Sequence, residues 1–66
     1  MRNKIDVNVE FLPGDLISFM DQAFVVISNH GRTGIVESWP DRERSYKDFA
    51  WKFNGIACMH IGRIDL

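Results

Sequence analysis

The hydrophobic pattern is densest in the centre of the chain, between residues 14 and 39, where short apolar runs alternate with turn residues. Residues 16–20 predict a short strand. Residues 23–28, AFVVIS, are apolar on both faces and rich in β-branched side chains, which predicts the central strand of a sheet. Asp21-Gln22 lies between these runs and predicts a tight turn.

The segments on either side of this centre also carry β patterns. Before it, residues 4–11 alternate apolar and polar side chains, which predicts a strand with one buried and one solvated face. The apolar positions are Ile5, Val7, Val9 and Phe11. After the central strand, residues 29–34 predict a loop with two glycines. Residues 35–39 predict a further strand that ends at Pro40, because proline has no N–H to donate to a ladder.

The segment from residue 45 to residue 55 supports two interpretations. As a helix it begins at Ser45, a capping residue, and ends at Gly55. Its apolar stripe would comprise Tyr46, Phe49, Ala50 and Phe53. As strands, its aromatic residues alternate and Asn54-Gly55 is a strong hairpin signal. The strand pairs would be Phe53 with Ile56, Trp51 with Cys58, and Phe49 with His60.

Aromatic enrichment favours the hairpin, and one short helix near residues 45–53 is the alternative. Residues 56–61 predict a strand on either interpretation, and residues 62–66 predict a tail. Five or six short strands with tight turns in 66 residues then predict a mainly β, antiparallel, small closed or half-closed barrel. Closure would also protect strand edges, which are a liability in a small domain.

A run of motifs points to the same architecture. PGD-L-I-x-F begins at Pro13, an apolar strand follows, and G-x-x-G-I-V ends at Val36. Over this part of the chain the sequence resembles small SH3-like barrels, including those of the KOW type. It departs from the KOW glycine spacing, because a whole strand separates Gly14 from Gly31. The resemblance implies a binding module.

Length and composition limit the class of protein. Sixty-six residues predict a single small domain, residues 1–66, and the eight basic and nine acidic residues give a net charge of −1. A duplex-DNA binder usually has a basic excess, so this balance weakens the case for nucleic acid. Cys58 is the only cysteine, which excludes an intramolecular disulfide and indicates a reducing, cytoplasmic location. No apolar run approaches the roughly 20 residues that span a bilayer, so no membrane association is expected.

The chain offers few groups for catalysis or metal binding. A structural zinc site needs four ligands, whereas the chain has one cysteine and two histidines. Cys58 lies in an apolar run, where burial makes a thiol less reactive, and His30 is its only candidate base besides His60. A barrel this small is also expected to lack a ligand cavity of about 300 Å³ or more. We therefore predict no enzyme, no metal site and no cofactor.

The strongest functional pattern is a cluster of aromatic and basic residues in the second half of the chain. Its members are Trp39, Arg42, Arg44, Tyr46, Lys47, Trp51 and Lys52. Such residues dominate protein interfaces, and they also stack single-stranded bases. Asp41, Glu43 and Asp48 interleave with the cations, and mixed sign favours a protein partner over a polyanion. The plain alternative is that Trp39 and Trp51 fill a thin core.

The loop at residues 29–34 is expected at or near the edge of this face. Its glycine amides, His30 and Arg32 could hold a phosphate or carboxylate, although glycines in such loops commonly just supply positive φ. We predict a non-catalytic module for protein–protein recognition in a regulatory or inhibitory role, as a monomer or homodimer; RNA or single-stranded DNA binding is the alternative. The predicted binding residues are Trp39, Arg42, Arg44, Tyr46, Trp51, Lys52, His30 and Arg32. Cations gathered away from acids would favour nucleic acid, and cations alternating with acids would favour protein.

Overall fold

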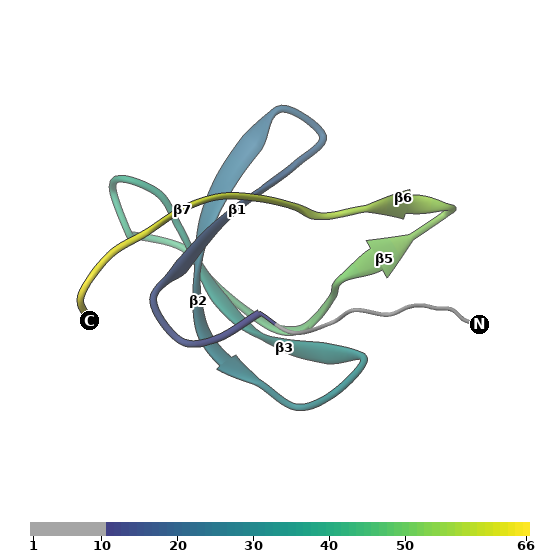
Figure 1. Ribbon diagram of the computed structural model, residues 1–66, viewed down its shortest axis with the longest axis horizontal. Coiled ribbons are helices and arrows are strands. Elements are labelled where there is room, and N and C mark those ends of the chain that lie inside the picture. The colour runs from purple at the N-terminus through teal and green to yellow at the C-terminus, as the bar shows by residue number, and fades with distance from the viewer. Residues whose placement is uncertain (1–10) are drawn as a thin grey trace.

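A computed structural model describes residues 11–66 and shows a mainly β domain (Figure 1). Its strands are β1 (Asp15–Phe19), β2 (Gln22–Asn29), β3 (Thr33–Ser38), β4 (Ser45–Ala50), β5 (Lys52–Phe53), β6 (Ile56–Ala57) and β7 (Met59–Arg63). No helix is present in the part of the chain that the structure describes. The strand predicted at residues 4–11 lies outside the described residues except for Phe11.

Five strands form one antiparallel sheet in the order β4-β3-β2-β1-β7, and β5 and β6 form a separate hairpin. The first four strands follow one another as neighbours, whereas β7 returns from the end of the chain to pair with β1. The strands predicted at residues 16–20, 23–28 and 35–39 are confirmed as β1, β2 and β3. The single strand predicted at residues 56–61 is two strands, and β7 continues into the predicted tail.

The predicted closure into a barrel is not observed. Among residues 11–66, no ladder joins β4 to β7, the two outer strands of the five-stranded sheet. The sheet carries a register shift in the β1–β7, β2–β3 and β3–β4 pairs. Such bulges increase the local twist and bend a strand, so the sheet is curved although it stays open.

A bulge also explains why the segment after residue 45 resembles a helix in the sequence. In the β3–β4 pair, Tyr46 lies opposite Val36 and Phe49 lies opposite Gly34, so two residues of β4 face one residue of β3. Asp48 has a φ of 60°, as an inserted residue often does. The bulge places Tyr46 and Phe49 on the same half-buried face despite a spacing of three. The helix alternative is therefore wrong, because a bulged strand produces the same apolar spacing.

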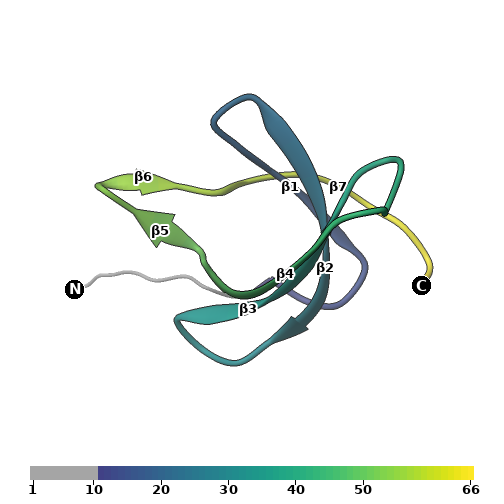
Figure 2. The same ribbon diagram turned by 180° about the vertical axis from the view of Figure 1, so that it is seen from behind.

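The hairpin predicted at Asn54-Gly55 is confirmed. Phe53 pairs with Ile56, and both turn residues have positive φ, 54° and 77°, as a type I′ turn requires. The Cys58 N–H donates to the Trp51 carbonyl at 2.8 Å, which continues the predicted register by one more pair. The hairpin extends away from the sheet (Figures 1 and 2).

One predicted strand pair is wrong. Phe49 does not face His60: Phe49 pairs with Gly34 of β3, and His60 pairs with Ile17 of β1. The hairpin ladder ends at the Trp51–Cys58 pair. Beyond this pair the two strands separate, because β4 pairs with β3 and β7 pairs with β1 in the larger sheet. Longer ladders with several neighbours satisfy more backbone groups than an isolated two-stranded hairpin does.

The core is small and aromatic. Its buried members are Ile17, Phe24, Val26, Val36, Trp51 and Cys58, and Phe11, Phe19, Tyr46 and Phe49 pack against it. The indole of Trp51 is 2% exposed, contacts the Phe11 ring at a centroid distance of 5.4 Å, and lies directly over Gly34. Its Nε1–H donates to Asn29 Oδ1 at 3.3 Å, so the one polar atom of the ring has a partner.

Candidate functional site: a groove between two turns

A surface groove of about 440 Å³ lies where the β1–β2 turn meets the loop between β3 and β4. Its lining residues are Asp21, Gln22, Ala23, Phe24, Ser38, Trp39, Asp41, Glu43, Arg44 and Tyr46. The groove is open to solvent and lies outside the sheet, so it is a different feature from the enclosed ligand cavity that a small barrel was expected to lack. The groove forms on the outside of the molecule, between two turns that project from the same end of the sheet, and reaches the core only at Phe24.

The β1–β2 turn is set by backbone geometry at two residues. Met20 and Asp21 have φ values of 51° and 66°, the type I′ pattern, and Phe19 pairs with Gln22 across them. The turn is thus one residue earlier than the predicted Asp21-Gln22. The Trp39 N–H donates to the Ala23 carbonyl at 3.0 Å, which holds the start of the β3–β4 loop beside this turn.

The β3–β4 loop is held closed by hydrogen bonds that converge on Ser38. The Ser38 carbonyl accepts from the Arg42 N–H at 2.8 Å, and the Ser38 N–H donates to the Arg44 carbonyl at 2.8 Å. The Ser38 hydroxyl donates to Asp41 Oδ1 at 2.5 Å and accepts from the Arg44 N–H at 3.1 Å. The hydrogen bond from Ser38, helped by the Glu43 N–H, lowers the pKa of the Asp41 carboxyl. Asp41 is therefore a fixed negative charge in the loop at neutral pH.

Aromatic rings form the inner wall of the groove. Tyr46 meets Phe24 edge to face at 5.7 Å, and Phe24 also contacts Phe49 at 5.0 Å. Phe24 is buried, whereas Trp39 and Tyr46 are partly exposed. The wall is thus anchored in the core on one side and open to a ligand on the other.

The groove is predominantly acidic, which the sequence did not indicate. Its lining holds three carboxylates, Asp21, Asp41 and Glu43, against the single guanidinium of Arg44. Arg42 is not in the lining, and its Nε lies 2.7 Å from Glu37 Oε1 in an ion pair. The excess of acids is evident only in the folded structure, because Asp21 is distant in sequence from the acids of the β3–β4 loop.

The structure places the predicted binding residues in two separate groups on the surface. A further one of these residues, Trp51, is buried in the core. Trp39, Arg44 and Tyr46 line the groove, and Arg42 lies in the same loop. Trp51 is buried in the core, so its ring is not available to a partner, and we remove it from the contact face.

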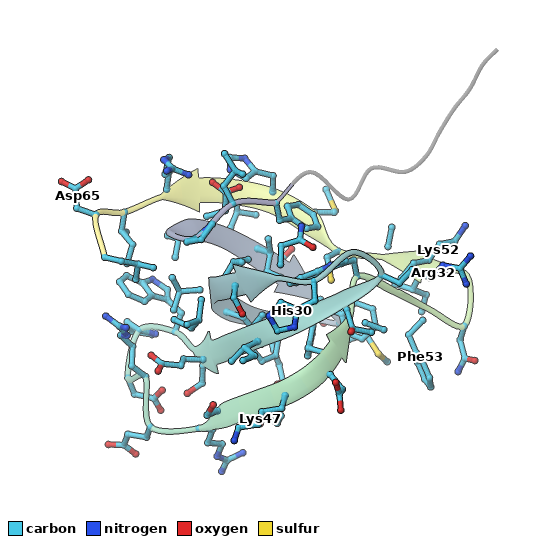
Figure 3. All side chains as sticks on the ribbon, turned by 90° about the horizontal axis from the view of Figure 1, so that it is seen from below. His30, Arg32, Lys47, Lys52, Phe53 and Asp65 are labelled. Carbon is cyan, nitrogen blue, oxygen red and sulfur yellow. The ribbon has the colours of Figure 1, made fainter. Side chains whose placement is uncertain are left out.

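The remaining predicted residues lie away from the groove. His30 and Arg32 belong to the β2–β3 loop, and Lys52 begins the β5–β6 hairpin. Arg32 and Lys52 point outward side by side, with His30 further along β2–β3 (Figure 3). The Trp51 N–H donates to the Arg32 carbonyl at 3.3 Å, which places the backbone of Arg32 beside the residue that precedes Lys52. His30 Nε2 lies 3.0 Å from the Ser28 hydroxyl, an ordinary local hydrogen bond.

Sequence reasoning also missed a strip of exposed apolar side chains. Phe53, Ile56, Met59 and Ile61 are 44–66% exposed and occupy the hairpin and β7. Phe53 and Ile56 are exposed because the β5–β6 hairpin leaves the sheet, whereas Met59 and Ile61 are exposed although β7 pairs with β1 in the sheet.

Cys58 is buried beside Trp51, and its Sγ lies 3.9 Å from the Ala50 carbonyl oxygen. Burial raises the pKa of this thiol to about 11. We expect Cys58 to react with a thiol reagent such as DTNB far more slowly at pH 8 in the native protein than in urea, because little thiolate exists and access is blocked. Equal rates under the two conditions would contradict the buried position.

In residues 11–66 there is no group of three or more histidine, cysteine, aspartate or glutamate side chains that could hold a metal ion. Cys58 and His60 do not share a site, because Cys58 is buried while the His60 ring lies 3.3 Å from Asp15 Oδ1. The same part of the chain contains no helix with the length and apolarity that crossing a bilayer demands. Comparison with family models, with curated proteins and with solved structures finds no match to this chain.

Proposed function

We propose that the protein is a small non-catalytic recognition module that binds a protein partner through the groove at Trp39, Arg44 and Tyr46, in a regulatory or inhibitory role. The observation that carries this proposal is that charges of both signs meet at the groove, with the acids in excess. Arg42 is paired with Glu37, and Arg44 lies among three carboxylates. A polyanion would meet these carboxylates before it could neutralise the cations, whereas a protein surface can match both signs.

A second candidate, single-stranded RNA or DNA binding, is favoured by one specific observation. Arg32 and Lys52 lie side by side, and Phe53 projects from the same hairpin (Figure 3). Phe53 is 57% exposed and points to the other side of the hairpin from Lys52 (Figure 3), so a bound strand would pass over the hairpin edge to use both the ring and the cations. We rank this candidate second, because two cations neutralise few phosphates and so supply little affinity.

The finer fold assignment is also a proposal: a curved sheet of the SH3-like type. It is supported by the bulges that bend the sheet and by the return of β7 to β1. A cytoplasmic location is supported only by a single cysteine that has no disulfide partner.

The two functions can be separated by two matched aromatic variants, Trp39→Ala in the groove and Phe53→Ala on the hairpin. Immobilised wild-type protein and both variants would be used to capture proteins from a lysate of the native host. We expect a specific protein to be retained by wild type and by Phe53→Ala but lost with Trp39→Ala. Retention that does not depend on Trp39 would overturn the groove as the contact face.

The same variants would be titrated against a fluorescein-labelled ten-nucleotide RNA by anisotropy at 20 mM and 150 mM salt. We expect no binding at either salt concentration. Binding that weakens with salt and is lost in Phe53→Ala would favour the second candidate, because stacking and phosphate contacts together give that signature.

A further inference from the structure

The groove carries a more specific signature than protein recognition alone. We infer that it binds a lysine- or arginine-bearing segment of the partner, with the cationic side chain against Trp39 and Tyr46 and its charge toward Asp21 and Glu43. The inference rests on the proposed function, because it names the kind of segment that the same groove would take.

The charge balance in the groove is the first argument. Asp41 is already engaged by the Ser38 hydroxyl and the Glu43 N–H, and Arg44 is close enough to contribute to the lowered pKa of its carboxyl. Asp41 and Arg44 therefore partly cancel each other. The carboxylates of Asp21 and Glu43 make no hydrogen bond or ion pair within residues 11–66. They leave a net negative potential that only a cationic ligand group would balance.

The arrangement of the two carboxylates is the second argument. Asp21 belongs to the β1–β2 turn and Glu43 to the β3–β4 loop, so the acids approach the groove from separate elements. The Ser38 hydrogen bonds and the type I′ turn hold those elements in place. The backbone that carries the two acids is therefore already ordered, so binding an ammonium or guanidinium group would cost entropy only in the two acidic side chains.

The aromatic wall is the third argument. Lysine and arginine carry long aliphatic stems that pack on apolar surface while the charge stays solvated. Partly exposed Trp39 and Tyr46 provide such a surface, and an aromatic face also attracts a cation directly. An acidic or purely apolar segment would use only part of this groove: the first would be repelled, and the second would leave two carboxylates desolvated without a partner.

The test uses three capped hexapeptides, (Arg-Leu)₃, (Glu-Leu)₃ and the citrulline analogue of the first, titrated into the full chain by ¹H–¹⁵N NMR. The two indole N–H signals report separately on the groove and the core, since Trp39 lines the groove and Trp51 is buried. We expect the arginine peptide to shift the Trp39 signal and to leave the Trp51 signal unchanged. The affinity of this peptide should fall as salt is raised from 20 to 500 mM. The glutamate and citrulline peptides should bind at least tenfold more weakly.

Three variants make the assignment specific. The double variant Asp21→Asn with Glu43→Gln should lower the affinity for the arginine peptide about fivefold, as expected for the loss of two solvent-exposed ion pairs. Arg44→Gln removes the one cation of the lining and should strengthen binding about twofold, a gain that partial unfolding could not produce. Asp48→Asn removes an exposed acid of β4 outside the lining and should leave the affinity unchanged.

The outcomes separate this inference from the proposed function. Equal binding of the three peptides, or an affinity that does not respond to Asp21→Asn with Glu43→Gln, overturns the inference. If protein capture in the same preparations still depends on Trp39, the proposed function survives that failure. If capture does not depend on Trp39 and no peptide shifts its signal, both fail.

Discussion

Gly34→Ala is expected to destabilise the domain by about 3 kcal/mol or more, the upper range for overpacking a tight site. A Cβ at this position would overlap both the Ser28 carbonyl oxygen and the Trp51 ring atoms Cζ2 and Cη2. The carbonyl is part of β2 and the indole is the largest fully buried side chain, so neither can withdraw without loss. The loss would be a large share of the few to ten kcal/mol that a domain of this size usually has.

The measurement is the free energy of unfolding by urea, followed by tryptophan fluorescence. Gly62→Ala is the matched control: it also adds a methyl group to a strand glycine, but its nearest contact would be Leu16 Cδ1 at an ordinary 3.5 Å. We expect that control to stay within about 0.5 kcal/mol of wild type. Similar losses in the two variants would contradict the close approach at Gly34.

A double variant tests the mechanism if Gly34→Ala alone does not fold. Trp51→Phe shortens the ring that overlaps the new methyl group, so the two substitutions together should cost less than the sum of their separate effects. Recovery should be incomplete, because the overlap with the Ser28 carbonyl remains. Strict additivity would show that Trp51 does not rest on Gly34.

Asp15→Asn is expected to lower the free energy of unfolding by about 2 kcal/mol at pH 7, because it removes a buried carboxylate that accepts several hydrogen bonds. Asp15 is 7% exposed and accepts from the Leu12 N–H at 2.8 Å and from Arg63 Nη1 at 2.6 Å. The His60 ring lies 3.3 Å away. These contacts tie the start of β1 to the end of β7, a strand pair that joins distant parts of the chain.

The cost of Asp15→Asn should depend on pH in a defined direction. Burial works to raise the pKa of Asp15, but the hydrogen bonds from Leu12, Arg63 and His60 outweigh it, and the net pKa is lowered from 3.8. A carboxyl with a lowered folded-state pKa stabilises fully above its unfolded pKa and loses that contribution as pH falls through the folded value. The gap between wild type and variant should therefore be constant from pH 7 to 5 and shrink below pH 3.8.

Urea unfolding at pH 7, 5 and 3 checks this dependence, with Asp65→Asn as the control. Asp65 is exposed near the C-terminus, and its replacement should change stability by less than about 0.5 kcal/mol at each pH. A gap that widens in acid would contradict the role of the ionised carboxylate.

The sequence alone determined three strands of the sheet and one turn, at Asn54-Gly55, whereas the β1–β2 turn was predicted one residue too late. Alternation and β-branched runs located β1, β2 and β3, and Asn54-Gly55 located the β5–β6 hairpin with its register. These features depend on neighbours within a few residues, so the local pattern contains the needed information. The aromatic and basic types around Trp39 and Tyr46 were identified for the same reason.

Only the tertiary structure decided how the strands combine and which side chains face a partner. The bulge in β4 gives Tyr46 and Phe49 a helix-like spacing, and the pairing of β7 with β1 replaces the contact expected between Phe49 and His60. Burial of Trp51 over Gly34 removes a predicted contact residue, and the meeting of two turns adds Asp21 and Glu43 to the groove. Contacts between residues far apart in the chain leave no periodic trace in a single sequence, because each depends on where every other strand has packed.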